Sequence, residues 1–227
     1  MTGTRRRLSP ARIAGLLADL CLAATSTVAL AEHSSTAAFT AQTADTGNTV
    51  TTAATFCAVP GGETVAVIND TYVDEADPTT ARGGSTTLRV ASGSAANAHT
   101  YLRFVLPPLQ PHCRITSATL RLYATSSQGT GAIDVHRAST TWSSATNTWN
   151  TVPRPAPAGT GVGFRAGTTG LHEWTVTTLV TEQYAGPNDG FLIRDRIDNA
   201  SPALATIYES SDSLTAPNRP VLVLTWG

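Results

Sequence analysis

The chain has 227 residues and a formal net charge of −1, and its fifteen basic residues are all arginine. Charged residues make up only 14% of the chain, whereas apolar residues make up 41%, which is enough to form a core. The near-zero charge, without a basic cluster in the main body, excludes a nucleic-acid-binding protein that depends on counterion release. Eighteen glycines and thirteen prolines, against one methionine, favour short strands and turns over a helical bundle.

Residues 1–31 have the organisation of a secretory signal peptide. Arg5-Arg6-Arg7 and Arg12 form a positive region, an apolar run follows, and Ala29-Leu30-Ala31 supplies a small-residue cleavage site. We therefore expect a signal helix that is cleaved after Ala31, and a mature protein without membrane contact. The alternative is an uncleaved anchor helix, in which Asp19 would cost about 2.5–3.5 kcal/mol at the bilayer centre.

Residues 32–62 form a Thr- and Ala-rich stretch that we expect to be a flexible spacer. Within it, Ala37-Ala38-Phe39-Thr40-Ala41 and Thr46-Gly47-Asn48-Thr49-Val50 resemble the amino-terminal region of bacterial surface and matrix proteins of the TasA/camelysin kind. The large β-domain of those proteins does not follow here. The resemblance therefore implies only an export signal read by a dedicated signal peptidase, and a bacterial source.

Three cysteines are present, and Cys21 leaves with the predicted signal peptide. Cys57 and Cys113 then form the even number expected of an exported protein, which predicts a disulfide bond between them. A loop of this size would contribute roughly 4 kcal/mol in the loop-entropy model. A metal-binding pair and a reactive thiol are the alternatives.

From Thr64 onwards the apolar residues alternate with period two, which is typical of strands with one buried face. The alternating positions lie at Val65–Val67, Leu88–Val90, Leu102–Leu106, Leu120–Leu122, Ile133–Val135, Leu171–Val176, Phe191–Ile193 and Val221–Val223. Glycine, proline, serine and asparagine punctuate these segments, and only residues 178–184 indicate a short helix. We predict an all-β fold, an antiparallel jelly-roll β-sandwich over residues 63–227.

Several motifs within this domain resemble the DNRLRE-type β-sandwich, classed as carbohydrate-binding module family 96. They are Asn69–Val73, Gly84–Val90, Tyr101–Phe104, Ile115–Tyr123, Trp142, Asn147–Pro153, Gly190–Ile193, Tyr208–Ser211 and Pro220–Leu224. Their order and spacing cover nearly the whole domain. The resemblance implies a jelly-roll sugar-binding module of a kind often attached to polysaccharide-degrading enzymes or surface proteins.

The chain lacks the sequence signatures of common hydrolases. It contains no G-x-S-x-G elbow and no H-E-x-x-H motif, and no two histidines have metal-ligand spacing. We therefore expect no catalytic residues and no enzymatic activity.

Four acidic residues cluster at the end of one predicted strand and in the loop after it: Asp70, Asp74, Glu75 and Asp77. Such oxygen-rich clusters suit Ca²⁺, which takes six to eight oxygen ligands. These residues are our candidates for a structural calcium site, although they lack the D-x-D-x-D-G pattern. The alternative is a solvated, turn-forming acidic loop.

Trp142 and Trp149 flank a polar loop and are candidates for stacking on a sugar ring, because pyranose rings have an apolar face. Packing of the loop is the alternative role. Two other tryptophans, Trp174 and Trp226, are expected in the core or at its edge.

Arg89, Arg103, Arg121 and Tyr123 alternate outwards on predicted strands, so adjacent strands would gather them on one polar sheet face. Arginine binds carboxylates through two parallel hydrogen bonds, and such a face would suit an acidic polysaccharide. A solvated exterior is the alternative.

These observations together predict a secreted, monomeric, non-catalytic module, located outside the cell or at its surface. Its expected partner is a polysaccharide or a cell-surface glycan, with acidic polysaccharides favoured. The alternative function is a structural or adhesive cell-surface or matrix module that binds no glycan.

Overall fold

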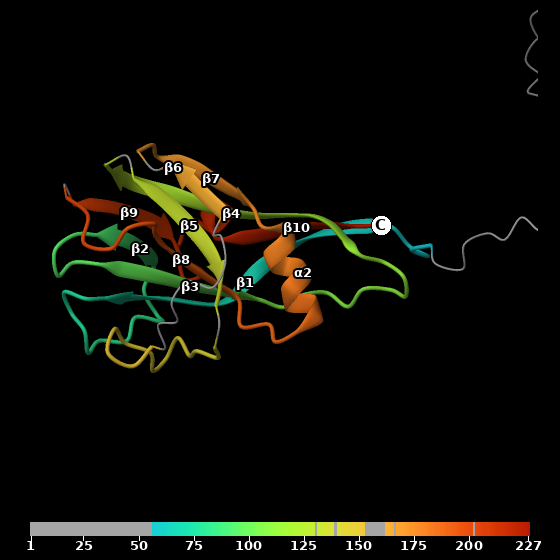
Figure 1. The fold of residues 1–227 in the computed structure, drawn as a ribbon, viewed down its shortest axis with the longest axis horizontal. Helices are drawn as coiled ribbons and strands as arrows, with labels where there is room; N and C mark the ends of the chain where they lie inside the picture. Colours follow the sequence, from blue (N-terminus) through green and yellow to red (C-terminus); the bar gives the residue numbers. More distant parts are fainter. Residues whose placement is uncertain (1–55, 130, 139, 153–161, 166, 202) are drawn as a thin grey trace, which may run out of the picture. The chain divides into compact units, whose positions relative to one another are not determined.

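The computed structural model describes residues 56–129, 131–138, 140–152, 162–165, 167–201 and 203–227. The predicted signal peptide and most of the predicted spacer lie outside these residues. The strands are β1 (Gly61–Asp74), β2 (Thr87–Ser92), β3 (Ala98–Phe104), β4 (Ile115–Gln128), β5 (Ala132–Arg137), β6 (Val162–Arg165), β7 (Gly170–Thr175), β8 (Phe191–Asp195), β9 (Leu204–Glu209) and β10 (Val221–Trp226). An α-helix, α2 (Thr177–Ala185), and a 3-10 turn, η1 (Ala216–Asn218), complete the described elements (Figure 1).

Two long strands connect the layers of the domain. β1 pairs with β10 through residues 61–66 and with β3 through residues 67–74, and the register of the second ladder shifts between Val67 and Asn69. β4 pairs with β10 through residues 115–121 and with β9 through residues 124–128, again with a register shift in the second ladder. Such bulges bend a strand and increase its twist, which lets one strand contribute to two layers.

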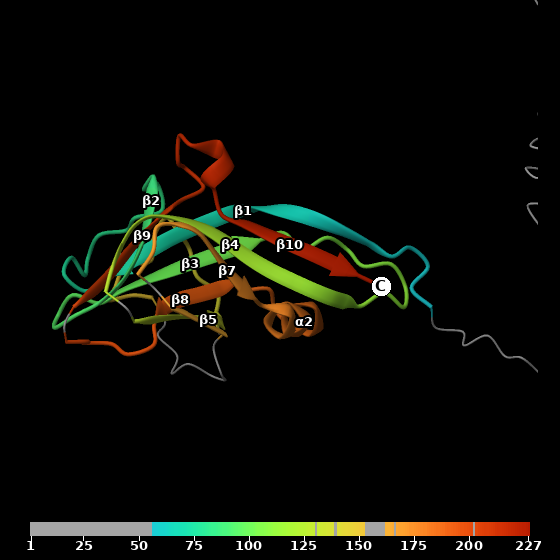
Figure 2. The same ribbon diagram turned by 90° about the horizontal axis from the view of Figure 1, so that it is seen from above.

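The remaining strands complete an antiparallel sandwich. β7 pairs with β4 on the edge opposite to β10, while β8, β5 and β6 follow β3 in the facing layer. β2 pairs with β9 and links β3 to β4. In Figure 2, β1, β10 and β4 lie above β8 and β5. The arrangement confirms the predicted all-β, antiparallel sandwich.

The alternation of apolar residues directs every second side chain into the main core. In β4, Ala118, Leu120 and Leu122 are buried, while Arg121 and Tyr123 between them are only partly buried. The largest side chains in this core are Trp174, Tyr208, Phe104 and Phe191. Burying one large apolar side chain stabilises a fold by about 1.5–3 kcal/mol. The expected core position of Trp174 is confirmed.

A smaller second core lies on the other face of β3 and β8. Tyr101 and Leu192 project from these strands, on the side opposite to Leu102 and Phe191. The cluster comprises Val73, Tyr101, Ala138, Trp142, Trp149, Val152 and Leu192. The segment after β5 therefore folds back over the outer face of the layer and covers it.

Helix α2 contains the predicted segment 178–184, and it packs against β4 and β5. Two strands, β6 and β9, were not predicted. In β9 the buried positions are Thr206 and Tyr208, whereas Ile207 between them is only partly buried. The hydrophobic alternation of β9 is therefore weak in the sequence, and β6 has only four residues.

Candidate functional site

A surface cleft of about 450 Å³ lies between the end of β3, the loop after it and helix α2. Much of its wall is apolar, including Ile68, Val105 and Pro107, of which Ile68 and Val105 are exposed. Polar side chains also reach the cleft: Arg103, Gln183, Tyr184 and Asn188. A mainly apolar cavity of this size with a few polar groups is typical of a small-ligand site.

Arg103 is held in place at this cleft by Trp142. Its guanidinium carbon lies 4.8 Å from the centre of the indole ring, and its Nη2 donates to the Trp142 carbonyl at 3.0 Å. The indole is itself fixed, because its Nε1 donates to the Asp189 carbonyl at 2.6 Å. Stacking on an aromatic ring orients a guanidinium without neutralising it. The cation is therefore preorganised and keeps its charge for a ligand.

Three buried polar atoms of the cleft residues have no hydrogen-bond partner among the described residues. They are Nε of Arg103, Nε2 of Gln183 and Oδ1 of Asn188. Gln183 is only 3% exposed, although glutamine is rarely buried. Leaving a buried polar atom unpaired costs about 1–3 kcal/mol, so such atoms call for an explanation. These two donors and one acceptor are unused hydrogen-bonding groups buried in the wall of the cleft.

The packing of the cleft fixes its other polar groups. Asn188 Nδ2 donates to the Phe104 carbonyl at 2.8 Å, and the Tyr184 hydroxyl donates to the Pro107 carbonyl at 2.7 Å. Burial raises the pKa of Tyr184, and the charge of nearby Glu63 raises it further. Tyr184 therefore remains a neutral phenol at neutral pH.

The structure does not bring the three predicted arginines together. Arg89 on β2 forms an ion pair with the buried Asp74, and Arg121 on β4 pairs with Glu173 of β7 at 2.6 Å. Only Arg103 lines the cleft. Tyr123 shares the outward side of β4 with Arg121, away from Arg103, because β3 and β4 belong to different layers.

Neither predicted tryptophan is exposed for stacking on a sugar. Trp142 is 4% exposed and Trp149 is 6% exposed, and both belong to the second core. The centre of the Trp149 ring lies 5.1 Å from that of His99, and the centre of the Trp142 ring lies 5.6 Å from that of Tyr101. Their burial agrees with the alternative role, packing of the loop, because their segment packs onto the sheet.

The four predicted calcium ligands bind other groups instead of one another. Asp70 is buried and accepts hydrogen bonds from the Ser211 backbone N–H and side-chain hydroxyl, at 2.6 and 2.9 Å. Desolvation by burial raises the pKa of Asp70, opposed by these hydrogen bonds. Asp74 accepts from Arg89 and from the backbone N–H of Ala76.

The other two acids likewise have partners of their own. Asp77 pairs with Arg82 at 2.7 Å, and Glu75 accepts from the backbone and side-chain N–H groups of Asn97. Within the described residues, no group of three or more histidine, cysteine or acidic side chains is placed to hold a metal ion. The predicted calcium ligands are thus not assembled into one site.

The predicted disulfide is present, with the Cα atoms of Cys57 and Cys113 4.2 Å apart. It links the segment before β1 to the loop between β3 and β4. Because this loop also supplies Val105, Pro107 and Leu109 to the cleft, the bond anchors one wall of the site.

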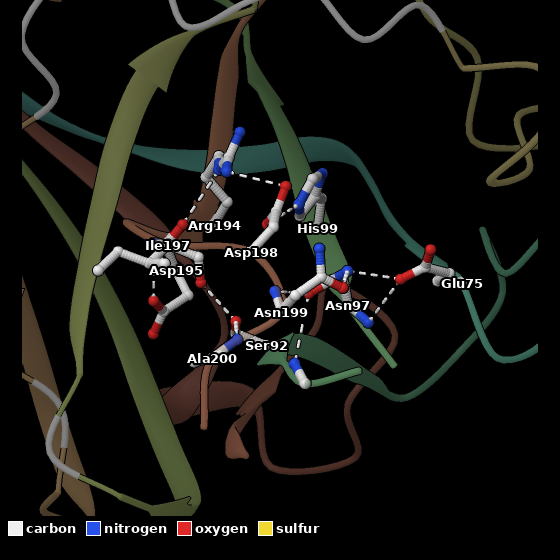
Figure 3. A network of polar contacts seen from close by, with 11 residues as sticks. Glu75, Ser92, Asn97, His99, Arg194, Asp195, Ile197, Asp198, Asn199 and Ala200 are labelled. Atoms are coloured by element: carbon white, nitrogen blue, oxygen red, sulfur yellow. Dashed lines mark hydrogen bonds and ion pairs between the residues drawn. The ribbon is translucent and has the colours of Figure 1, made fainter. Parts of the chain in front are cut away.

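A separate polar network, shown in Figure 3, connects the β2–β3 and β8–β9 loops. Asn97 Nδ2 donates to Asn199 Oδ1 at 3.0 Å, and Asn97 Oδ1 accepts from the Asn199 backbone N–H at 2.8 Å. Asp198 contacts His99 Nε2 at 3.1 Å and Arg194 Nη2 at 2.9 Å. These carboxylate and amide groups satisfy one another, so the network holds the loops together.

Gln183, Tyr184 and Asn188 were not predicted as site residues. A glutamine in the only predicted helix carries no signal of burial in the sequence. Its place beside Arg103 depends on how α2 lies against the loop after β3, and these segments are about 80 residues apart in the chain.

An antiparallel sandwich with a preformed cleft of apolar walls and unpaired polar atoms defines a ligand-binding module. The family model for carbohydrate-binding module family 96 matches residues 62–226, and the chain belongs to this family. None of the curated proteins compared with the chain matches it. Modules of this class bind carbohydrate without catalysis and are typically extracellular, which confirms the prediction that the domain is not an enzyme. No helix in the described part of the chain has the length and apolar character needed to cross a membrane.

Proposed function

We propose that the protein is a secreted binding module for an acidic polysaccharide, which it holds in the cleft beside Arg103. The observation that carries this proposal is the Arg103 guanidinium, which stacks on Trp142 and has no carboxylate partner among the described residues. Arginine is well suited to carboxylates because its donors match the two carboxylate oxygens. The DNRLRE-like motifs support the same function.

The other cleft residues have roles that suit a sugar. Gln183 Nε2 and Asn188 Oδ1 are an unpaired donor and an unpaired acceptor buried in the cleft wall, and a small side-chain shift would bring them to the hydroxyl groups of a sugar. The apolar side chains of Ile68 and Val105, with the neighbouring Tyr184, offer a surface for the apolar face of a pyranose ring. Binding breaks no covalent bond, and the sugar leaves unchanged.

The test uses an acidic polymer, polygalacturonate, and a neutral glucan as comparator. We expect retention of the folded protein on polygalacturonate and weaker retention on the glucan. Arg103→Gln should lower the affinity about ten- to hundredfold, because a hydrogen bond to a charged group contributes about 1.5–3 kcal/mol. The matched control is Arg121→Gln, which removes the same charge from a different surface and should bind normally.

Unchanged binding by a folded Arg103→Gln protein, as checked by thermal unfolding, would contradict this proposal. Binding to no glycan at all would instead favour the structural or adhesive alternative.

Export is the second part of the proposal. The arginine-rich start, the apolar run and Ala29-Leu30-Ala31 support cleavage after Ala31, and the TasA/camelysin-like segment supports a dedicated signal peptidase. Amino-terminal sequencing of the secreted protein should begin at or a few residues after Glu32. Membrane-bound protein that retains Met1 would overturn it.

A further inference from the structure

We infer that the cleft is one end of a longer groove that binds consecutive sugar units, with Arg114 as a second ligand-contacting cation. This inference rests on the proposed function and specifies how the same site engages a polymer. Its basis is that three neighbouring cavities share walls and that two unpaired arginines line them.

The cavities adjoin one another along the β3–β4 loop. Beside the first cleft lies a second cavity of about 450 Å³, and Leu109 and Tyr184 line both. A third cavity, of about 460 Å³, follows, and Arg114 lines both the second and the third. Each volume falls in the range of a small-ligand site, so the row is larger than one such ligand requires.

The arginines of the groove differ from most of the other described arginines; Arg137 and Arg219, which donate to backbone carbonyls, also form no ion pair among the described residues. Five described arginine side chains form ion pairs with carboxylates: Arg82, Arg89, Arg121, Arg194 and Arg196. Arg103 and Arg114, which line the cavities, form no ion pair among the described residues. An arginine that is already paired adds little to the attraction of an incoming anion, because its carboxylate partner offsets its charge. The charges of Arg103 and Arg114 are not offset in this way.

Arg114 is exposed, but its backbone is firmly placed. Its N–H donates to the Gly227 carbonyl at 3.2 Å, and the Gly227 N–H donates back to the Arg114 carbonyl at 3.1 Å. The neighbouring Cys113 is tied by the disulfide to Cys57. The side chain therefore extends from a backbone that is held at the wall of the second cavity.

Tyr184 lies between the two cations, because it lines the first and second cavities. Glu63 is the carboxylate whose charge acts on this phenol. The attraction for an acidic chain therefore resides at Arg103 and Arg114, and the middle of the groove suits the apolar face of a sugar. A ligand long enough to reach both arginines gains a second contact without a second association cost.

The test measures the affinity of galacturonic acid oligomers, from two to eight units, for four proteins: the wild type, Arg103→Gln, Arg114→Gln and Arg121→Gln. For the wild type we expect affinity to rise with length and then level off. Arg114→Gln should bind the dimer with the affinity of the wild type. Its affinity for the longer oligomers should be about tenfold lower than that of the wild type. The matched control, Arg121→Gln, should follow the wild-type curve, because its side chain lies outside the groove.

The outcomes separate this inference from the proposed function. If Arg103→Gln weakens binding at every length and Arg114→Gln has no effect at any length, the groove inference is wrong and the proposed function stands. A wild-type affinity independent of length would also overturn the inference. If the wild type binds no oligomer, both fail.

Discussion

At the scale of the single residue, the burial of His172 and its hydrogen bonds determine its protonation state and its tautomer. His172 is 1% exposed; its Nε2 lies 2.9 Å from the Thr168 carbonyl and its Nδ1 lies 3.0 Å from the Tyr208 hydroxyl. A carbonyl only accepts, so Nε2 carries the proton and Nδ1 accepts from Tyr208. Desolvation lowers the pKa of His172 and raises that of Tyr208, and both groups remain neutral in the core.

This histidine should make the domain less stable in mild acid. The folded-state pKa lies below the ordinary value of 6.5, so the unfolded chain takes up a proton first as the pH falls. The contribution of His172 to the free energy of unfolding is therefore complete above pH 6.5 and declines below it. Urea unfolding at pH 7.5 and 5.0 measures this effect. The free energy of unfolding should fall less between the two pH values for His172→Gln than for the wild type. An equal loss in the two proteins would contradict the assignment.

Trp149 should behave as a core residue. Because it is 6% exposed, Trp149→Ala should lower the free energy of unfolding by roughly 3–5 kcal/mol, as for other large-to-small core changes. Urea denaturation measures this loss. A sugar-stacking role predicts the opposite result, with intact stability and lost retention on polysaccharide.

At the scale of the element, one glycine controls the connection from α2 to β8, which carries Asn188. Gly190 has φ +81°, and a Cβ added there would lie 2.1 Å from the Leu102 carbonyl oxygen. Gly190→Ala should therefore destabilise the domain by more than about 1 kcal/mol, because the conformation is strained and the backbone of β3 is in the way. Thermal unfolding measures the effect, and Gly84→Ala is a suitable comparator because its added Cβ would meet nothing within 4 Å.

The disulfide acts on another element, the loop that forms the cleft wall. Its two cysteines are 56 residues apart in the chain, so replacing both by serine should cost about 4 kcal/mol of stability in the loop-entropy model. Affinity for polygalacturonate should also fall, because the loop must be ordered on binding. Denaturation and binding measurements on the double variant check both effects, and unchanged affinity would show that packing alone holds the wall.

At the scale of the whole molecule, a net charge of −1 gives an acidic polymer no general attraction. Binding must then depend on local cations at the groove, and it should weaken as salt rises. The screening length falls from about 10 Å at 0.1 M to about 3 Å at 1 M ionic strength. Affinity chromatography on polygalacturonate at both salt concentrations tests this, and retention that does not change would exclude arginine–carboxylate contacts as its main source.

Eight of the ten described strands and the Cys57–Cys113 disulfide were predictable from the sequence alone. Residues such as Leu120 and Leu122 alternate with Arg121, and the period-two pattern is a local property that needs no partner segment to be recognised. It failed for β9, where Thr206 and Tyr208 occupy the buried positions. These polar side chains can be buried because other core residues form hydrogen bonds with them, as His172 does with Tyr208.

The polar and aromatic residues that form the candidate site could be identified only from the folded structure. Trp142 became a support for Arg103, because the segment after β5 folds back onto the sheet and buries the indole. Gln183 and Asn188 lie near Arg103 because α2 and the loop after it lie against the end of β3 and the loop that follows β3. The physical reason is that a binding site is made by contacts between distant segments, and the pattern of one segment does not specify which others will lie against it.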